Sequence, residues 1–247
     1  MNLTIDIGNT CTKLVAFDGL SPVEEVRMDT GDTGLLDAFC EKYHFSKGIY
    51  STVIALPAEV RQKLSSLPFP MLCLEPGVTP VPIVNDYHTP HTLGADRLAA
   101  AVGAYCKHEG RHPVLVIDVG TCITYDFVDA NGHYLGGNIS PGPTIRFRAL
   151  HEFTSSLPLV VRKGDTPSLG DTTETAIRCG VLQGIEYEMQ GYIRDFLLKY
   201  PSLYVYLTGG VHLNLHISEK KCIFADDFIV PEGLNRILIY NHEERKS

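Results

Sequence analysis

Residues 3–10 of the chain read LTIDIGNT, and residues 116–121 read VIDVGT. In each stretch an apolar strand ends at a carboxylate, and a glycine with small polar residues follows. Each stretch leads into a second apolar run, at 11–17 and at 122–128, which predicts the returning strand of a hairpin. Because glycine lets backbone amides approach an anion, each turn predicts a place for phosphates and a cation. The repeat therefore predicts two half-domains of the same kind.

The composition predicts a globular protein with a sizeable core. The 247 residues are 44% hydrophobic, and this length suits one large domain or two modest ones. Asp and Glu number 29 against 21 Lys and Arg, a formal net charge of -8, which argues against a nucleic acid bound through its phosphates. The seven cysteines are scattered and form no Cys-x-x-Cys pair, a pattern typical of reduced thiols in a cytosolic protein.

The start of the chain and its apolar runs predict a location. The first strand begins almost at once, without the charged leader and apolar core of a signal peptide. No apolar run approaches the roughly 20 residues that span a bilayer. We therefore expect no membrane segment and a cytoplasmic location.

The other segments alternate between predicted helices and strands, which indicates an α/β fold. Helical spacing or alanine content predicts helices at 33–43, 57–67, 95–108, 143–153, 172–200 and 231–240. Short apolar runs predict further strands at 48–55, 113–118, 133–135 and 203–207. The six prolines between residues 67 and 90 predict a sheet edge and a crossing between halves. The glycine pair at 136 and 137 predicts a turn.

The first glycine turn offers several groups to a nucleotide. Its side chains that can donate to phosphate oxygens are Asn9, Thr10, Thr12 and Lys13. Asp6, at the strand end, is placed to hold a hydrated magnesium ion that bridges those phosphates. One such turn alone is equally typical of an ordinary hairpin. The second turn, with Asp118, repeats the pattern and favours a nucleotide site.

A third glycine turn, Thr208–Gly210, follows a predicted strand and opens a predicted helix, where backbone can pass close to a base or sugar. Alone, it is equally typical of an ordinary strand-to-helix turn. Together, the three turns resemble the actin-like superfamily of sugar kinases and heat-shock ATPases. This resemblance implies two ribonuclease-H-like half-domains, at 1–110 and 111–247, each with a central mixed sheet flanked by helices.

The stretch Gly94–Arg97 narrows the prediction to an enzyme. An adjacent acid and arginine would by themselves form an ordinary first turn of a helix. However, Tyr87 and Pro90 precede them in a loop that would lead a substrate to the helix end. Asp96 could then accept the proton of a primary hydroxyl that attacks a γ-phosphate, and Arg97 could pair with a substrate carboxylate.

As a set, the motifs resemble those of the type III pantothenate kinase family, in the family's order and over nearly the whole chain. The matching stretches are Asp6–Thr10 with Lys13, Gly94–Arg97, Asp118–Thr121, Gly136–Gly142 and Thr208–Gly210. The resemblance implies ATP-dependent phosphorylation of pantothenate to 4′-phosphopantothenate, the first step of coenzyme A biosynthesis. It also implies a homodimer, with dimerisation helices in the second half.

The resemblance further implies a role for each matching position. Asp96 would be the catalytic base. The residues implied to hold ATP are Asp6, Ile7, Gly8, Asn9, Thr10, Cys11, Thr12, Lys13 and Thr121. The residues implied to hold pantothenate are Tyr87, Gly94, Ala95, Asp96, Arg97 and Thr173. Asp6 would bind the magnesium ion that accompanies ATP, and Asp118 would bind a monovalent cation, K⁺ or NH₄⁺.

Departures from the family pattern leave alternatives open. The family often has Asn-Thr where this chain has Thr172-Thr173, so a neighbour of Thr173 could make the implied contact instead. The function could also be that of another small-molecule kinase of the superfamily, or of a non-catalytic regulatory member. The residues whose loss would favour a regulatory role are all present: Asp6, Asp96, Arg97 and Asp118.

Overall fold

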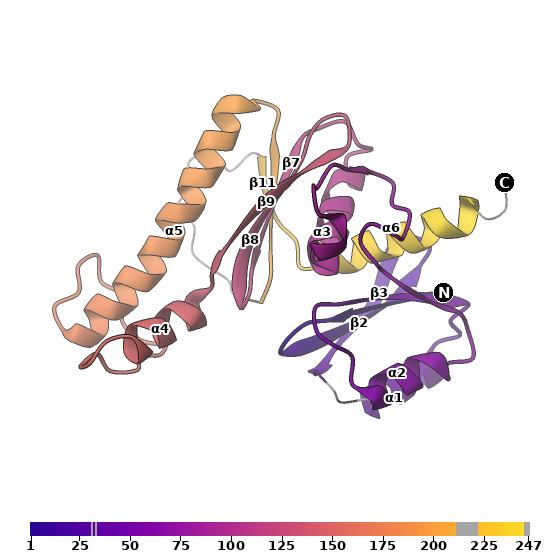
Figure 1. Ribbon diagram of the computed structural model, residues 1–247, viewed down its shortest axis with the longest axis horizontal. Coiled ribbons are helices and arrows are strands. Elements are labelled where there is room, and N and C mark those ends of the chain that lie inside the picture. The colour runs from indigo at the N-terminus through magenta and orange to yellow at the C-terminus, as the bar shows by residue number, and fades with distance from the viewer. Residues whose placement is uncertain (31, 33, 211–221, 245–247) are drawn as a thin grey trace. The chain divides into compact units, whose positions relative to one another are not determined.

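The computed structural model describes the whole chain except residues 31, 33, 211–221 and 245–247. The described residues form two compact units (Figure 1). The first unit contains Met1–Arg111, Val128–Gly136 and the chain from Phe228 onward, and the second contains His112–Phe127 and Gly137–Asp227.

A five-stranded sheet with the order β3-β2-β1-β4-β5 forms the centre of the first unit. Its strands are β1 (Asn2–Ile7), β2 (Cys11–Asp18), β3 (Ser21–Asp29), β4 (Lys47–Thr52) and β5 (Met71–Cys73). Strand β1 pairs antiparallel with β2 and parallel with β4. The first predicted hairpin is therefore confirmed, and β5 supplies the sheet edge predicted for the proline-rich segment.

Helices cover both faces of this sheet. The α-helices of the first unit are α1 (Gly34–Lys42), α2 (Ala58–Ser65), α3 (Ala95–Cys106) and α6 (Ile229–Glu244). Side chains alternate along a strand, so Leu3, Ile5 and Ile7 of β1 share one face and form a core with residues of α1 and α2. On the opposite face, Asn2 donates a hydrogen bond to Asn235 of α6 at 2.8 Å. Figure 1 shows α1 and α2 on one side of the sheet and α6 on the other.

Helices α3 and α6 approach each other at glycines. A Cβ atom on Gly103 would lie 2.1 Å from the carbonyl oxygen of Ile229, and one on Gly233 would lie 1.8 Å from that of Ala99. Because neither position has room for a side chain, the two helix backbones come into direct contact. This contact fixes α3, whose first turn carries Asp96.

The second sheet has the strand order β11-β10-β7-β8-β9-β6. Its strands are β6 (Val84–Asn85), β7 (Val114–Val119), β8 (Cys122–Val128), β9 (His133–Pro141), β10 (Tyr204–Thr208) and β11 (Ile223–Ala225). Strands β7 and β8 are neighbours and confirm the second predicted hairpin. Strand β6 and the start of β9 pair within the first unit. A buried core joins β7, β8 and β10 to α4 (Pro143–Glu152) and α5 (Thr173–Lys199).

The structure differs from the predicted elements at a few places. Strands β3 and β11 were not predicted, since β3 is largely exposed and β11 has only 3 residues. The predicted turn at Gly136 and Gly137 is wrong, because β9 runs through both. Gly136 has a φ of 118°, so the glycine permits an unusual backbone angle inside a strand. The helix predicted after Gly210 falls outside the described residues.

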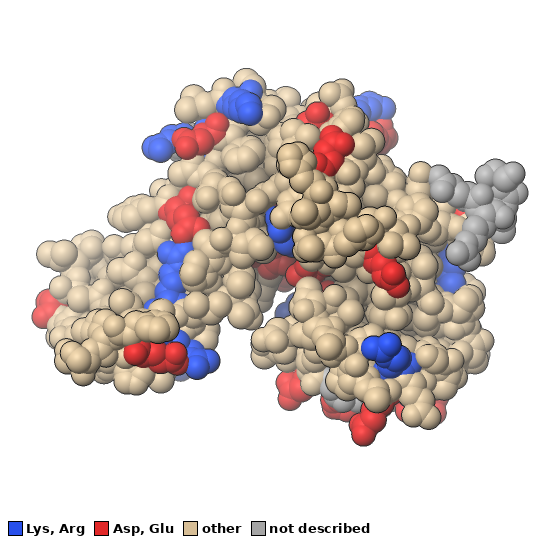
Figure 2. Space-filling view, viewed as in Figure 1, with Lys and Arg blue, Asp and Glu red and all other residues tan. Residues whose placement is uncertain are grey.

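Among the described residues, no helix combines the length and apolar content needed to cross a membrane. All seven cysteines are free thiols. On the face drawn in Figure 2, acidic and basic side chains lie interspersed.

Candidate functional site

The first glycine turn, between β1 and β2, presents its tip to solvent. The amide of Gly8 donates to the carbonyl oxygen of Cys11 at 3.1 Å, and a Cβ atom on Gly8 would lie only 2.9 Å from that oxygen. Asn9, Thr10 and Cys11 are exposed. The closed turn thus leaves polar groups free to meet an anion, as the sequence predicts for a phosphate turn.

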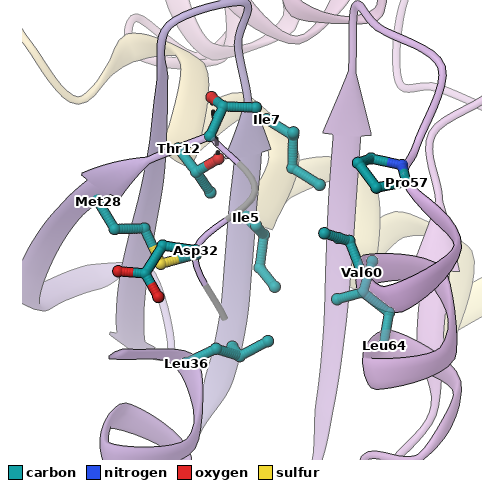
Figure 3. A pocket seen from close by; sticks show the side chains of 10 residues that line it. Ile5, Ile7, Thr12, Met28, Asp32, Leu36, Pro57, Val60 and Leu64 are labelled. Atoms are coloured by element: carbon teal, nitrogen blue, oxygen red, sulfur yellow. Dashed lines mark hydrogen bonds between the residues drawn. The ribbon is translucent and has the colours of Figure 1, made fainter. Parts of the chain in front are cut away.

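Thr12 lies behind this turn rather than on it. Its side chain is 2% exposed and lines a core cavity of about 20 Å³ with Ile5 and Met28 (Figure 3). Its hydroxyl lies 3.5 Å from that of Thr30, which donates to the carbonyl oxygen of Gly8 at 2.9 Å. The cavity has room for about one water molecule. Thr12 therefore supports the turn from the core side, between its register partners Ile7 and Met28.

A row of polar side chains crosses the sheet beside the turn. Ser51 of β4, Asp6 of β1, Lys13 of β2 and Arg27 of β3 occupy successive register positions on one face. The Ser51 hydroxyl donates to Asp6 Oδ1 at 2.8 Å. Glu25, one pleat away on β3, lies 4.0 Å from Lys13 Nζ and accepts from Arg27 Nε at 2.5 Å. The row sets an anion and a cation side by side at the strand end.

Asp6 is held as an unusually weak acid. Burial raises its pKa to about 6, the hydrogen bond from Ser51 opposes this rise, and the negative charge of Asp96 adds to it. Lys13 lowers the pKa again through its positive charge. The influence of Asp96 means that two carboxylates from separate elements, β1 and α3, share one electrostatic environment.

Asp96 stands in the first turn of α3. Its Oδ1 accepts from the backbone N–H of Arg97 at 2.8 Å, and a Cβ atom on Gly94 would lie 2.5 Å from this oxygen. Burial raises the pKa of Asp96, while the Arg97 backbone and charge oppose the rise. A carboxylate with a raised pKa accepts protons more readily, which is what a general base needs.

The predicted substrate residues of the first unit gather around the same helix end. The guanidinium of Arg97 lies 5.9 Å from the ring centroid of Tyr87, a cation–π distance, and Arg97 is only 6% exposed. Gly94 and Ala95 line a cavity of about 530 Å³ together with Thr52 and other residues of the loops after β4 and β5. The first residue of α3, Ala95, and the residue before it thus line a space large enough for a small organic molecule, and Asp96 and Arg97 follow them directly in the chain.

The second unit brings three motifs of the sequence together around Asp118. Asp118 of β7 is the register partner of Thr208 of β10. Gly209 has a φ of 104°, and a Cβ atom there would lie 2.5 Å from Asp118 Oδ1 and 2.4 Å from the carbonyl oxygen of Val119. Gly142 donates to the carbonyl oxygen of Thr121 at 3.0 Å. The turns after β7, β9 and β10 therefore pack against one another through glycines.

Thr173 is the first residue of α5, and the residue before it, Thr172, caps the helix. The Thr172 hydroxyl accepts from the backbone N–H of Thr175 at 3.1 Å and caps the helix. Thr173 is exposed and lines a cavity of about 880 Å³ formed by side chains of α4 and α5. Because Thr172 serves as the cap, Thr173 is the residue of this pair whose side chain is available for a ligand.

Some site residues were not predicted from the sequence. Ser51, Glu25 and Thr30 belong to no glycine turn, and they reach the site only through strand register and the loop after β3. The site residues divide between the units, with Asp6 and Asp96 in the first and Asp118 in the second. Within the described parts of the chain, no three His, Cys, Asp or Glu side chains gather as a metal site.

Solved structures share this fold across nearly the full chain. Component A of (R)-2-hydroxyglutaryl-CoA dehydratase from Acidaminococcus fermentans superposes with a TM-score of 0.55 at 15% identity, covering 100% of this chain and 99% of its own. A Campylobacter jejuni protein assigned to the Baf family of transcriptional activators gives a TM-score of 0.60 at 22% identity, with 98% and 99% coverage. At these identities the likeness shows the fold alone, an actin-like ATPase fold, as predicted.

Sequence comparison identifies the family. The chain matches the model of the family described as type III pantothenate kinase over residues 2–195. A type III pantothenate kinase of Bacteroides fragilis is 52% identical over 98% of this chain and 99% of its own length. One from Azobacteroides pseudotrichonymphae is 40% identical over 100% of both chains. The chain therefore belongs to the type III pantothenate kinase family, which confirms the resemblance seen in its motifs.

Proposed function

We propose that the chain transfers the γ-phosphoryl group of ATP to the primary hydroxyl of pantothenate, with Asp96 as the base. The hydroxyl oxygen forms a new bond to the γ-phosphorus, the bond to the β,γ-bridging oxygen breaks, and ADP leaves. The hydroxyl proton passes to the Asp96 carboxylate as the bond forms. The observation that carries this proposal is the place of Asp96, a half-buried carboxylate held by the Arg97 backbone N–H at the start of α3, next to the residues that line a cavity.

The residues proposed to bind ATP belong to the two glycine turns. In the first unit the exposed turn residues Asn9, Thr10 and Cys11 and the Lys13 ammonium group would meet the phosphates. Gly8 would contribute backbone, and the buried Ile7 and Thr12 would support the turn from behind. In the second unit Thr121 would contribute. Backbone amides and one lysine suit an anion of this size because they neutralise charge without large rearrangement.

Pantothenate would bind at the start of α3. Its hydroxyl would approach Asp96, and Gly94 and Ala95 line a cavity that could take the rest of the molecule. Tyr87 and Arg97, which contact each other, are proposed as further polar contacts. The exposed threonine at the start of α5, Thr173, is proposed as a further contact. Its availability follows from the capping role of Thr172.

Two ions would accompany the nucleotide. A single carboxylate suits a hydrated Mg²⁺ that is held mainly by phosphates, and Asp6, whose charge is costly when buried, would gain from such a cation. Asp118, beside Gly209 in the second unit, is proposed to bind a monovalent cation, K⁺ or NH₄⁺. Either ion would offset negative charge on the transferring phosphoryl group.

We also propose a homodimer through α4 and α5 and a cytoplasmic location. Large apolar side chains of the second unit are exposed, among them Phe153 at 85% and Leu169 at 84%, and an apolar partner would cover such residues. Sedimentation velocity should show a dimer for the natural chain and a monomer for Phe153→Asp. A natural chain that sediments as a monomer would contradict this proposal.

An ATP-dependent assay with pantothenate tests the proposed function directly. We expect ADP release that requires pantothenate and K⁺, is partly restored by NH₄⁺, and collapses in Na⁺ or a large organic cation. Turnover of other small alcohols but not pantothenate would favour another kinase of the superfamily. Failure to bind either ATP or pantothenate would favour a regulatory member, and equal rates in all salts would remove the cation role of Asp118.

Replacing Ser51 by alanine should move the acid limb of the pH profile to higher pH. The Ser51 hydroxyl stabilises the Asp6 carboxylate, so its loss should raise the Asp6 pKa above about 6. Since a protonated Asp6 holds no cation, kcat/KM for ATP should fall as pH drops through this pKa, and earlier in Ser51→Ala. The measurement is kcat/KM for ATP from about pH 5 to 8. At the alkaline end of this range the variant and the natural enzyme should have the same kcat/KM. Coincident acid limbs would contradict the role of Asp6, and Ser65→Ala on α2 is the control.

A further inference from the structure

Four polar side chains from four elements meet inside the second unit. Glu188 of α5 accepts hydrogen bonds through Oε1 from the Tyr125 hydroxyl at 2.9 Å and from the Ser140 hydroxyl at 2.5 Å. Through Oε2 it accepts from Nη2 of Arg146 at 2.5 Å. One carboxylate thereby joins β8, β9, α4 and α5.

The carboxylate of Glu188 accepts three hydrogen bonds, which favour its ionised form. Burial tends to raise its pKa, but the hydrogen bonds from Ser140, Arg146 and Tyr125 outweigh burial and lower it. Charge-assisted hydrogen bonds to a partly buried carboxylate are among the stronger polar contacts in proteins. Tyr125 is 1% exposed, so the network is anchored in the core and holds its other members in fixed positions.

Arg146 connects Glu188 to the end of β9. While its Nη2 binds Glu188, its Nε donates to the carbonyl oxygen of Pro141 at 2.7 Å. The hydroxyl of Ser140, the residue before, is bound by the same Glu188. Two successive residues of the chain are therefore held by side chains of α4 and α5.

The next residue, Gly142, rests directly on the second phosphate turn. Its amide donates to the carbonyl oxygen of Thr121 at 3.0 Å. A Cβ atom on Gly142 would lie 2.3 Å from the carbonyl oxygen of Gly120, so the two segments are in backbone contact. A shift at Ser140 or Pro141 would move the turn as well, since there is no free space between the two backbone segments.

We propose that Glu188 and Arg146 are positioning residues for ATP, which hold the Gly120–Thr121 turn in its phosphate-binding geometry through Ser140, Pro141 and Gly142. This inference rests on the proposed ATP site. Neither residue needs to touch ATP, because hydrogen bonds and backbone contacts connect Glu188 to the turn without a break. The expected signature is therefore weaker ATP binding with unchanged pantothenate binding.

Glu188→Gln tests the proposal, with Glu186→Gln on the same helix as the matched control. Loss of the charge should loosen Arg146 and raise the Kd for MgATP about fivefold, as expected for one weakened charge-assisted contact. The KM for pantothenate should stay within about twofold, and the control should match the natural protein in both. Because the Kd is measured by calorimetry without pantothenate, it remains informative even if the proposed phosphorylation fails.

A double-mutant cycle separates positioning from general stability. In a Thr121→Ala background, Glu188→Gln should change the Kd for MgATP by less than about twofold. The proposed contact between the Thr121 side chain and ATP, which Glu188 would position, is already missing in this background. If Glu188→Gln does not fold, Arg146→Lys serves instead, since lysine can keep the ion pair but cannot also bind Pro141. An unchanged Kd in a folded single variant, or the same fivefold effect in both backgrounds, would overturn the proposal.

Discussion

Replacing Asp96 by asparagine should leave a folded protein whose kcat is lower by about 10²- to 10⁴-fold, the usual contribution of a general base. Asparagine has the same shape, and its side-chain oxygen can still accept from the Arg97 backbone N–H as Asp96 does at 2.8 Å. The start of α3 should therefore keep its structure. What is lost is a group that can take up the proton of the attacking hydroxyl.

Steady-state kinetics with pantothenate and ATP would measure the loss, and circular dichroism would confirm the fold. The matched control is Glu59→Gln, which also removes an acid from the first turn of a helix in the same unit, α2, and should keep normal activity. If Asp96→Asn retained near-normal kcat, Asp96 would be only a favourable first-turn acid, and the base would have to be sought elsewhere.

Replacing Gly209 by alanine should damage both stability and catalysis. The φ of 104° is strained for alanine, and the new Cβ would lie 2.4 Å from the carbonyl oxygen of Val119 and 2.5 Å from Asp118 Oδ1. Strain and overpacking of this kind each cost about 1–3 kcal/mol. The new Cβ would push the Asp118 carboxylate away from its position. Because displacing a binding group lowers the rate, we also expect kcat/KM for ATP to fall at least about tenfold.

Chemical denaturation and kinetics of the neighbouring variant provide the comparison. Gly210→Ala changes the adjacent glycine, where a Cβ would meet no described atom within 4 Å, so it should remain close to the natural protein in both measurements. If Gly209→Ala were as stable and active as Gly210→Ala, the packing of the glycine turn against Asp118 would have no functional weight.

Local patterns predicted most elements of the fold because those elements carry their own signals. The hairpin strands are apolar runs that end in glycine turns, and α5 begins at a threonine cap. Strand β3 has no such signal: its residues are mostly exposed or half-buried, and its conformation depends on pairing with β2. The Gly136–Gly137 pair misled for a related reason, since glycine marks unusual backbone angles as well as turns.

Sequence motifs identified the residues proposed to carry out the chemistry, but not the residues that hold them in position. Asp6 and Asp96 belong to recognisable stretches, whereas Ser51 reaches Asp6 from 45 residues away through a parallel register. Glu188 stands 63 residues from Tyr125 on a helix without any motif. Contacts of this range depend on tertiary structure. The inward direction of the Thr12 side chain could have been predicted from the sequence. Side chains alternate along a strand, so Thr12 and Lys13 of β2 point to opposite faces of the sheet.

The glycine contact between α3 and α6 has a consequence for how the chain is made. Helix α6 belongs to the first unit, yet it is translated after the whole of the second. Domains commonly fold as units during synthesis, the N-terminal one first. Here the sheet that carries Asp6 has to wait for the last helix before its second face is covered. We therefore expect this face of the first sheet to stay uncovered during synthesis until the residues of α6 have emerged from the ribosome.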